Sequence, residues 1–430
     1  MRGSVDAEAL NAVADPAERL FFRALRSDAA ALRRADAEAW RSLCEVALRT
    51  FAAPLLHATL SRDGLLDLAP EEVGLRLSRV RAWNIERWAV ATRQVERIAD
   101  VLAAAGVRCL MLKGAHVGRL YPVSGARAMG DIDLLVPPTQ VERARRALEN
   151  VGYVATDPER YEREHPDSHQ LPQLRIRGGL AVEVHRTLGE GAADVPWSPG
   201  VWDRARSLGA GPALCMEPLD ALLYTCKHLA VHHRFETSNG FAGLADVGVL
   251  VQRYRFDPAA LRERASEWSV GPAVATCLLL ARDLLRADVP AELLEAVAVP
   301  GLTQAAPSAV WLLLHFSSLG ITRHLQLVTR ATLNPAPPYA GIRGARPVRA
   351  AWAYARAAGL PPVDDVRLEH PRLVDSRWPR AGYALLWSRL AWRHLGLVRL
   401  LSARTRLEVR ARRDAHRRAL DVVLGARDKG

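Results

Sequence analysis

The sequence lacks several features that would place it in a specialised class. It has no long run of consecutive apolar residues, so we expect no transmembrane helix. The segment Met1–Leu20 carries acids early and has no apolar core, so we expect no secretory signal and a cytoplasmic location. Cysteine is scarce and never in CxxC spacing, which predicts buried thiols rather than disulfides or a zinc site. The five are Cys44, Cys109, Cys215, Cys226 and Cys277.

Most of the chain also lacks an excess of charge of either sign. From Ile321 to Gly430 there are 22 Lys and Arg against 8 Asp and Glu, whereas the preceding 320 residues carry 37 and 39. The net charge of +12 therefore comes from the C-terminal quarter. Such an Arg-rich segment can meet an acidic partner, acidic lipid or nucleic acid, or can be a solvated helix face. Residues 381–401, with tryptophans among leucines and arginines, suit a membrane surface or packing on the core. The segment carries no firm signal for nucleic-acid binding.

The pattern of residues divides the chain into four regions. Residues 1–105 are rich in Ala, Leu, Glu and Arg, with apolar residues at helical spacing. Residues 106–214 mix short strands, glycine loops and a helix, and residues 215–333 again predict helices. Residues 334–430 predict a Pro/Arg-rich linker and an Arg-rich C-terminal helix. We therefore expect an α+β protein, in which a small α/β domain with a mixed sheet is flanked by helical regions.

The region of residues 106–214 has a clear order of elements. Val107–Gly114 predicts a buried strand that ends in glycine, and Asp131–Pro137 predicts a second strand. A helix should follow with Thr139 as its N-cap and Gly152 just past its end. A hairpin that turns at Gly178–Gly179 should complete the domain.

Two aspartates lie in the second strand, GDIDLLV. Because successive side chains of a strand point to opposite faces, Asp131 and Asp133 share one face and Ile132 points into the core. Neighbouring carboxylates repel each other, and aspartate is depleted in strand interiors. A divalent cation between them would relieve the repulsion. A solvated pair in a loop or edge strand, or the DxD motif of metal-dependent glycosyltransferases, would explain the same two residues.

A third acid lies in the later segment AVEVH, where Glu183 and His185 share one face. Two strands that display acids from one face build an oxygen-rich site, and magnesium prefers carboxylate and phosphate oxygens. Two such ions would polarise an α-phosphate, activate an attacking hydroxyl and neutralise a pyrophosphate leaving group. We therefore expect Asp131, Asp133 and Glu183 to hold Mg²⁺, with Mn²⁺ as the alternative.

The block KGAHVGRLYPVSGARAMGDIDLLVP, the helix after it and the later VEVHRTL resemble the bacterial uncharacterised nucleotidyltransferase family. That family belongs to the DNA polymerase β-like nucleotidyltransferase superfamily. The resemblance covers about residues 80 to 260, and it implies that Asp131, Asp133 and Glu183 are the three metal-binding acids. It also implies an enzyme that transfers a nucleoside monophosphate from an NTP to an acceptor and releases pyrophosphate.

Four residues around the two strands are candidates for binding nucleotide or acceptor. Lys113 can contact triphosphate oxygens as a point charge, or can be an ordinary lysine at the end of a strand. Lys113-Gly114 stands where the superfamily usually has Gly-Ser, and Gly114 permits close approach of the chain. Arg127 can hold a phosphate or the acceptor, or can pair with one of the acids. Gly130 would let the substrate approach the strand.

Three further candidates lie on the later strand and in the helical region after it. His185 can orient Glu183, bind substrate, accept a proton or be purely structural. The resemblance extends to CKHL and LADV, and it implies that His228 and Asp246 help to form the cleft.

Two functions from different classes account for these residues. The first is the Mg²⁺-dependent nucleotidyltransferase, whose acceptor would be a small molecule, a peptide, a protein or an RNA end. The second is a protein that binds a nucleotide or nucleotide-sugar, non-catalytic or glycosyl-transferring, with the basic tail docked on nucleic acid or membrane. The presence of all three acids favours the enzyme.

Overall fold

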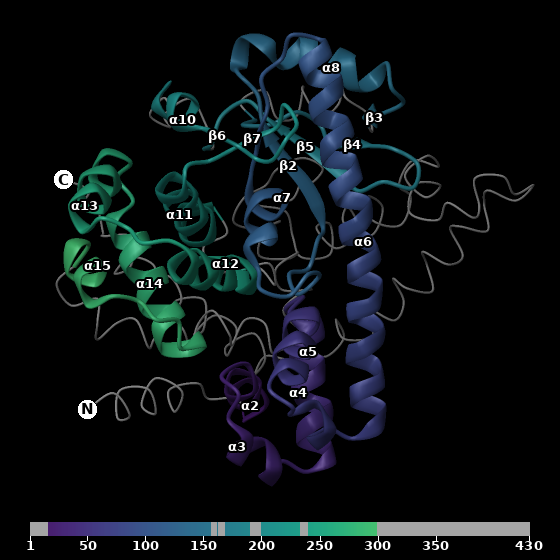
Figure 1. The fold of residues 1–430 in the computed structure, drawn as a ribbon, viewed down its shortest axis with the longest axis vertical. Coiled ribbons are helices and arrows are strands. Elements are labelled where there is room, and N and C mark those ends of the chain that lie inside the picture. Colours follow the sequence, from purple (N-terminus) through teal and green to yellow (C-terminus); the bar gives the residue numbers. More distant parts are fainter. Residues whose placement is uncertain (1–15, 156–160, 162–167, 190–198, 233–239, 299–430) are drawn as a thin grey trace, which may run out of the picture. The chain divides into compact units, whose positions relative to one another are not determined.

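The computed structural model describes residues 16–155, 161, 168–189, 199–232 and 240–298 (Figure 1). All of these except Tyr161 belong to one of the chain's two compact units. The expected linker and Arg-rich helix of residues 334–430 lie outside the described residues. The expected boundaries at residues 105, 214 and 333 stay predictions.

The first part of this unit is helical, as its residue spacing predicts. Aspartates cap two of the short helices, since Asp28 and Asp36 each accept a backbone N–H from the first turn. No helix in the described part of the chain combines the length and apolar character needed to cross a bilayer. The elements are α2 (Pro16–Leu25), α3 (Ala29–Arg34), α4 (Ala37–Arg49), α5 (Ala53–Arg62), η1 (Leu66–Leu68) and α6 (Glu71–Ala104).

Helix α6 is the longest of the described elements and links the helical part to the sheet. Figure 1 shows it as one continuous helix, which contacts α4 and α5 in its first half and α8 in its second. Glu71 and Glu72 lie in its first turn, where their negative charges interact favourably with the positive end of the helix dipole and stabilise the helix. Gly106 follows the C-cap Ala105, and its φ of 69° is in the left-handed region that glycine adopts at little cost.

Within the described residues, the sheet has seven strands in the order β3-β4-β5-β2-β1-β7-β6. β2 pairs in parallel with β5 and antiparallel with β1, and β1 pairs in parallel with β7. The predicted α+β class and mixed sheet are therefore confirmed. The strands are β1 (Leu110–Met111), β2 (Asp131–Leu135), β3 (Val154–Ala155), β4 (Leu174–Arg175), β5 (Ala181–His185), β6 (Arg206–Ser207) and β7 (Leu214–Cys215).

The connection from β1 to β2 holds α7 (Lys113–Val117), η2 (Gly118–Leu120) and then a glycine-containing loop. This agrees with the helical turns and loop that the sequence predicts. The hairpin from β4 to β5 also forms as predicted, and Gly178 in its turn has a φ of 73°.

The start of the helix after β2 differs from the prediction. A 3-10 turn, η3 (Pro138–Gln140), precedes α8 (Val141–Glu149), so Gln140 and not Thr139 is the residue before the helix. Thr139 is wrong as the N-cap because the turn that begins at Pro138 includes it. Gln140 makes no capping bond either, since its side chain accepts the backbone N–H of Arg108.

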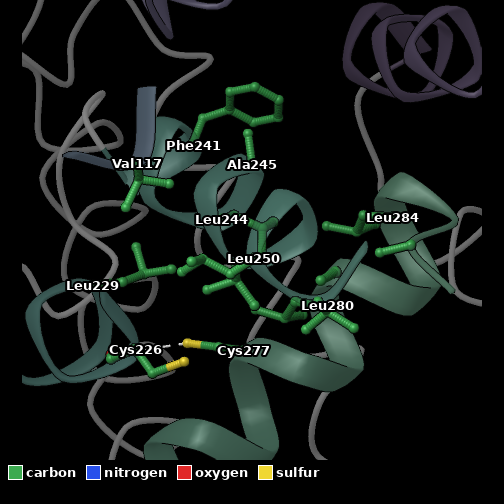
Figure 2. Packing of buried hydrophobic residues seen from close by; sticks show 14 of the residues in the cluster. Val117, Cys226, Leu229, Phe241, Leu244, Ala245, Leu250, Cys277, Leu280 and Leu284 are labelled. Atoms are coloured by element: carbon green, nitrogen blue, oxygen red, sulfur yellow. Dashed lines mark hydrogen bonds between the residues drawn. The ribbon is translucent and has the colours of Figure 1, made fainter. Parts of the chain in front are cut away.

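The remaining described elements form the helical part that the sequence predicts after the sheet. Figure 2 shows Leu229, Leu244, Leu250, Leu280 and Leu284 packed together in this part. Cys226 and Cys277 lie side by side in the same cluster, and all five cysteines are buried and free, as predicted. The elements are α11 (Pro218–Lys227), η4 (His228–His232), α12 (Gly240–Arg253), α13 (Pro258–Glu267), α14 (Gly271–Leu285) and α15 (Ala291–Ala296). A further short helix, α10 (Pro199–Arg204), lies earlier, between β5 and β6.

Two hydrophobic clusters hold this unit together. One fills the space between α6, α8 and one face of the sheet. The other joins the N-terminal helices to the helices that follow the sheet, and the rings of Phe21 and Phe241 lie 5.2 Å apart within it. The helices before and after the sheet therefore share one core.

Candidate active site

The two strands that carry the acids lie side by side. The parallel register of β2 and β5 sets Asp133 opposite Glu183. Asp131 lies two residues earlier on β2, so its side chain leaves the same face of the sheet. Ile132 and Val182 are fully buried on the other face. The alternation predicted from the sequence thus brings three carboxylates to one face.

Asp133 is the most enclosed of the three acids, and one of its oxygens contacts both a lysine and a histidine. Its Oδ1 lies 2.7 Å from Lys113 Nζ and 3.0 Å from His185 Nε2. Because an ionised carboxylate only accepts, Nε2 of His185 donates this bond. On Glu183, Oε1 accepts from Gln173 Nε2 and Oε2 lies 3.9 Å from His185 Nε2. These contacts fix the direction of both carboxylates.

Lys113 is the first residue of α7, just after β1, and it is one of three lysines in the chain. Its φ of 40° is in the left-handed region, which non-glycine residues rarely adopt. Such strain persists only where the surroundings hold the backbone in place. Burial acts to lower the pKa of Lys113, but Asp133 outweighs it and raises that pKa. The side chain therefore stays an ammonium ion beside the acids.

The pKa values of the three acids differ because their surroundings differ. Burial and repulsion from Asp133 raise the pKa of Asp131 to about 6. Burial and repulsion from both aspartates raise the pKa of Glu183 to about 7. Burial acts the same way on Asp133, but Lys113 and His185 outweigh it and hold that pKa well below its ordinary value. A cation bound beside these groups favours their ionised forms.

The donor set fits a divalent cation. Ligand atoms of Asp133, Glu183 and His185 lie within 4.8 Å of one another. Asp131 is not part of this trio, although the sequence predicts it as a ligand. Residues two apart on a strand are separated by about 6.6 Å, whereas paired residues on adjacent strands are about 4.8 Å apart. The two paired carboxylates offer the oxygen ligands that Mg²⁺ and Mn²⁺ prefer.

Arg127 pairs with Asp246 on α12 rather than with one of the three acids. Its Nε and Nη2 each lie 2.8 Å from an oxygen of that carboxylate, and Tyr121 donates to the same group at 2.8 Å. The side chains of Arg127 and Asp246 are 12% and 3% exposed. Burial acts to lower the pKa of Arg127, but the nearby carboxylate of Asp246 outweighs this effect and raises that pKa above its ordinary value. The guanidinium therefore stays charged. The helical part after the sheet is thus tied to the loop before β2.

Helix α6 holds the backbone of that loop. Asn84 Nδ2 donates to the carbonyls of Gly125 and Arg127, both at 2.8 Å, and Trp88 Nε1 donates to the second of these. Arg87 donates through Nε and Nη2 to the carbonyls of Met129 and Gly130. These bonds fix the chain immediately before Asp131.

A cavity of about 660 Å³ opens over this face of the sheet. Nine of the ten residues predicted for the site line it, and their chemical roles stay predictions. They are Lys113, Gly114, Arg127, Gly130, Asp131, Asp133, Glu183, His228 and Asp246. The tenth, His185, is 1% exposed and lies behind Asp133, where it can orient that carboxylate but not touch a ligand in the cavity.

The sequence missed several residues that shape the cavity. Gln173 orients Glu183, and Arg87 holds the loop before β2, but neither belongs to a motif. Leu48, Phe51 and Trp83 also line the cavity, and they come from the N-terminal helical region, which the sequence predicts as separate from the catalytic domain. Exposure of two large aromatic rings would have been a signal, but it is visible only in the folded chain.

Comparison with known families adds an independent finding. The model of a family described as an uncharacterised nucleotidyltransferase matches residues 36–286, more than half of the chain. The matched span runs from α4 to α14 and contains every residue of the site described above. No curated protein and no solved structure matches the chain.

Proposed function

The chain belongs to the uncharacterised nucleotidyltransferase family, and on this premise we propose that it transfers a nucleoside monophosphate from an NTP to an acceptor. Family membership supports transferase activity in general. The NTP, the acceptor hydroxyl and the dependence on Mg²⁺ or Mn²⁺ are the further steps proposed here.

The convergence of three acids and two cations on one cavity supports this function most directly. Asp131, Asp133 and Glu183 leave one face of the sheet, and Lys113 and Arg127 line the same cavity. Carboxylates bind the metal ions that accompany a triphosphate, and ammonium and guanidinium groups bind phosphate oxygens.

The carboxylates of Asp133 and Glu183 would hold the divalent cation, with Asp131 beside them. When bound, the cation supplies charge neutralisation for the α-phosphate and for the pyrophosphate leaving group. Lys113 would bind the triphosphate through its ammonium group while its contact with Asp133 keeps it at the site. His185 would keep Asp133 in the orientation that the cation needs.

The transfer forms one bond and breaks one. The hydroxyl oxygen of the acceptor attacks the α-phosphorus, and a new P–O bond forms. The bond from the α-phosphorus to the oxygen that bridges to the β-phosphate breaks, and its electron pair leaves with pyrophosphate. Glu183 would take the hydroxyl proton, because its carboxylate lines the same cavity as the two aspartates.

Pyrophosphate release tests this function. The full chain is incubated with Mg²⁺, each common NTP carrying a labelled α-phosphate, and a small-molecule extract. We expect release that requires both the metal and the extract, together with a labelled product one nucleoside monophosphate heavier than its acceptor. Asp133→Asn should lose this activity, whereas Asp100→Asn, an exposed aspartate on α6, should keep it. Equal release by Asp133→Asn, or in the presence of EDTA, would contradict the proposal.

A further inference from the structure

One wall of the cavity is apolar, although the cavity also holds the acids. This apolar wall comes from the end of α4, the turn after it, the start of α5 and the middle of α6. It consists of Leu48, Phe51, Ala53, Pro54, Val80 and Trp83. Phe51 and Trp83 are 46% and 56% exposed. Isolated exposed apolar residues are common on proteins. Two large rings on the wall of a charged cavity instead present an apolar surface to a ligand.

The polar side chains next to the apolar wall are already engaged. Both ends of the Asn84 amide hydrogen-bond to the main chain of the loop before β2. Nδ2 donates to two carbonyls, and Oδ1 accepts from Met129 N. Arg87 donates to the carbonyls of Met129 and Gly130. A nucleobase has several polar edge atoms, and leaving them without partners is costly. This wall therefore suits an apolar group better than a base.

Polar atoms that can meet a base lie on another part of the lining. Thr225 on α11 and His228 at the start of η4 line the cavity. Thr225 Oγ1 donates to the carbonyl of Ala221, and a hydroxyl oxygen that donates one hydrogen bond can still accept another from a base. The lining thus separates a part suited to a nucleoside from the apolar wall. A transferase needs room for both of its substrates, and these two surfaces differ in the chemistry that they can recognise.

Arg87 connects the apolar wall to the acids. Its guanidinium lies 4.8 Å from the centre of the Trp83 ring, while its N–H groups hold the carbonyls of the two residues before Asp131. A cation over an indole face is an attractive arrangement that also limits rotation of the ring. The ring is therefore held beside the backbone that positions the first carboxylate. A molecule that rests on Trp83 can extend a polar group toward the acids.

Resting on the proposed nucleotidyl transfer, we propose that the apolar wall binds the acceptor, and that the acceptor is a small molecule with an aromatic or aliphatic body and a hydroxyl group. The body lies against Phe51 and Trp83. The hydroxyl reaches the carboxylates, and the nucleoside occupies the side of Thr225 and His228.

Binding of a neutral apolar fluorophore, N-phenyl-1-naphthylamine, tests the assignment on the full chain. We expect a saturable site in the native chain whose affinity falls by about tenfold in Trp83→Ala and in Phe51→Ala. Leu75→Ala is the matched control, because Leu75 is 49% exposed on the same helix and does not line the cavity. It should bind the probe as the native chain does. Circular dichroism checks that each variant is folded.

Calorimetric titration with each NTP and Mg²⁺ separates the acceptor from the nucleotide. Trp83→Ala should bind the NTP within about twofold of the native chain, and saturating NTP should leave the affinity for the fluorophore unchanged. If the NTP displaces the fluorophore, or if Trp83→Ala binds the NTP about tenfold more weakly, the wall holds the base and the assignment is wrong. Equal probe binding by Trp83→Ala and Leu75→Ala would also overturn it.

Failure of the proposed function gives a different result. If the native chain binds no NTP, the nucleotidyl transfer fails and the acceptor role fails with it. Loss of fluorophore binding in Trp83→Ala would still show an apolar subsite in that case. Asp133→Asn separates the two sites within one chain, since it should lose the NTP and keep the fluorophore.

Discussion

The buried pair of Arg127 and Asp246 should be costly to break from one side. Asp246→Asn keeps the shape of the side chain but removes its charge, and it leaves the guanidinium of Arg127 beside a neutral amide. Tyr121 can adapt, because its hydroxyl can accept from the new amide as readily as it donates to the carboxylate. Arg127 has no such freedom, since a guanidinium only donates and stays charged.

The geometry sets the size of the effect. Three contacts of 2.8 to 3.0 Å join Arg127 to Asp246, and both side chains are largely removed from water. Loss of one partner of such a pair costs about 3–5 kcal/mol of stability. We expect about 3 kcal/mol, because Arg127 borders the cavity and water can reach part of it. Arg127→Met combined with Asp246→Asn removes both charges and should recover at least about 2 kcal/mol of the summed losses.

Urea unfolding of the two single variants and the double variant measures this coupling. Glu72→Gln is the control, because Arg41 and Glu72 form an ion pair whose side chains are 59% and 60% exposed. It should change stability by no more than about 1 kcal/mol. Losses in the two single variants that add up in the double variant would refute the reasoning, as would a loss in Asp246→Asn no larger than that in Glu72→Gln.

Two other perturbations test the described packing and electrostatics. Burial and, to a smaller extent, the charge of Arg119 lower the pKa of His116 to about 4 in the folded chain. The imidazole in the unfolded chain therefore binds a proton as the pH falls below about 6.5, whereas in the folded chain it binds one only near pH 4. Stability should fall as the pH drops from 6.5 toward 4, by about 2 kcal/mol at pH 5, and urea unfolding of His116→Gln should show a flatter profile. A Cβ at Gly118 would overlap the Trp88 ring, so Gly118→Ala should lose about 1–3 kcal/mol. A Cβ at Gly74 on α6 would meet open space, so Gly74→Ala should raise the free energy of unfolding by up to about 1 kcal/mol in the same urea assay. Equal changes in the free energy of unfolding for Gly118→Ala and Gly74→Ala would contradict the described packing.

Features that depend on neighbouring residues could be predicted from the sequence. The alternation in β2 places Asp131 and Asp133 on one face, and the turn at Gly178 forms the hairpin that carries Glu183. Both follow from strand geometry and turn chemistry, which act over a few residues. The prediction of Thr139 as the N-cap was wrong, because a 3-10 turn begins at Pro138 and includes Thr139. The same residues could start either a 3-10 turn or the α-helix, and the local pattern does not decide between them.

Features that depend on distant residues could not be predicted. Arg127 and Asp246 are 119 positions apart, and the pattern in the sequence does not say which acid an arginine reaches. The side chains of Asp133, Glu183 and His185 place their ligand atoms within 4.8 Å of one another because β2 and β5 pair in a parallel register. That register is a property of the folded sheet, so the sequence pattern does not show it. The apolar wall is a further case, because Phe51 and Trp83 meet the acids only after the helices before β1 have packed against the sheet.

Metal-dependent binding of an NTP is the most direct test of the central claim that these carboxylates hold a cation at a nucleotide site. Calorimetric titration of the native chain with each NTP should give saturable binding in the presence of Mg²⁺ or Mn²⁺ and none after EDTA. Asp133→Asn should lose this binding and Asp100→Asn should retain it. NTP binding that is the same with and without the metal, or the same in Asp133→Asn as in the native chain, would contradict the account.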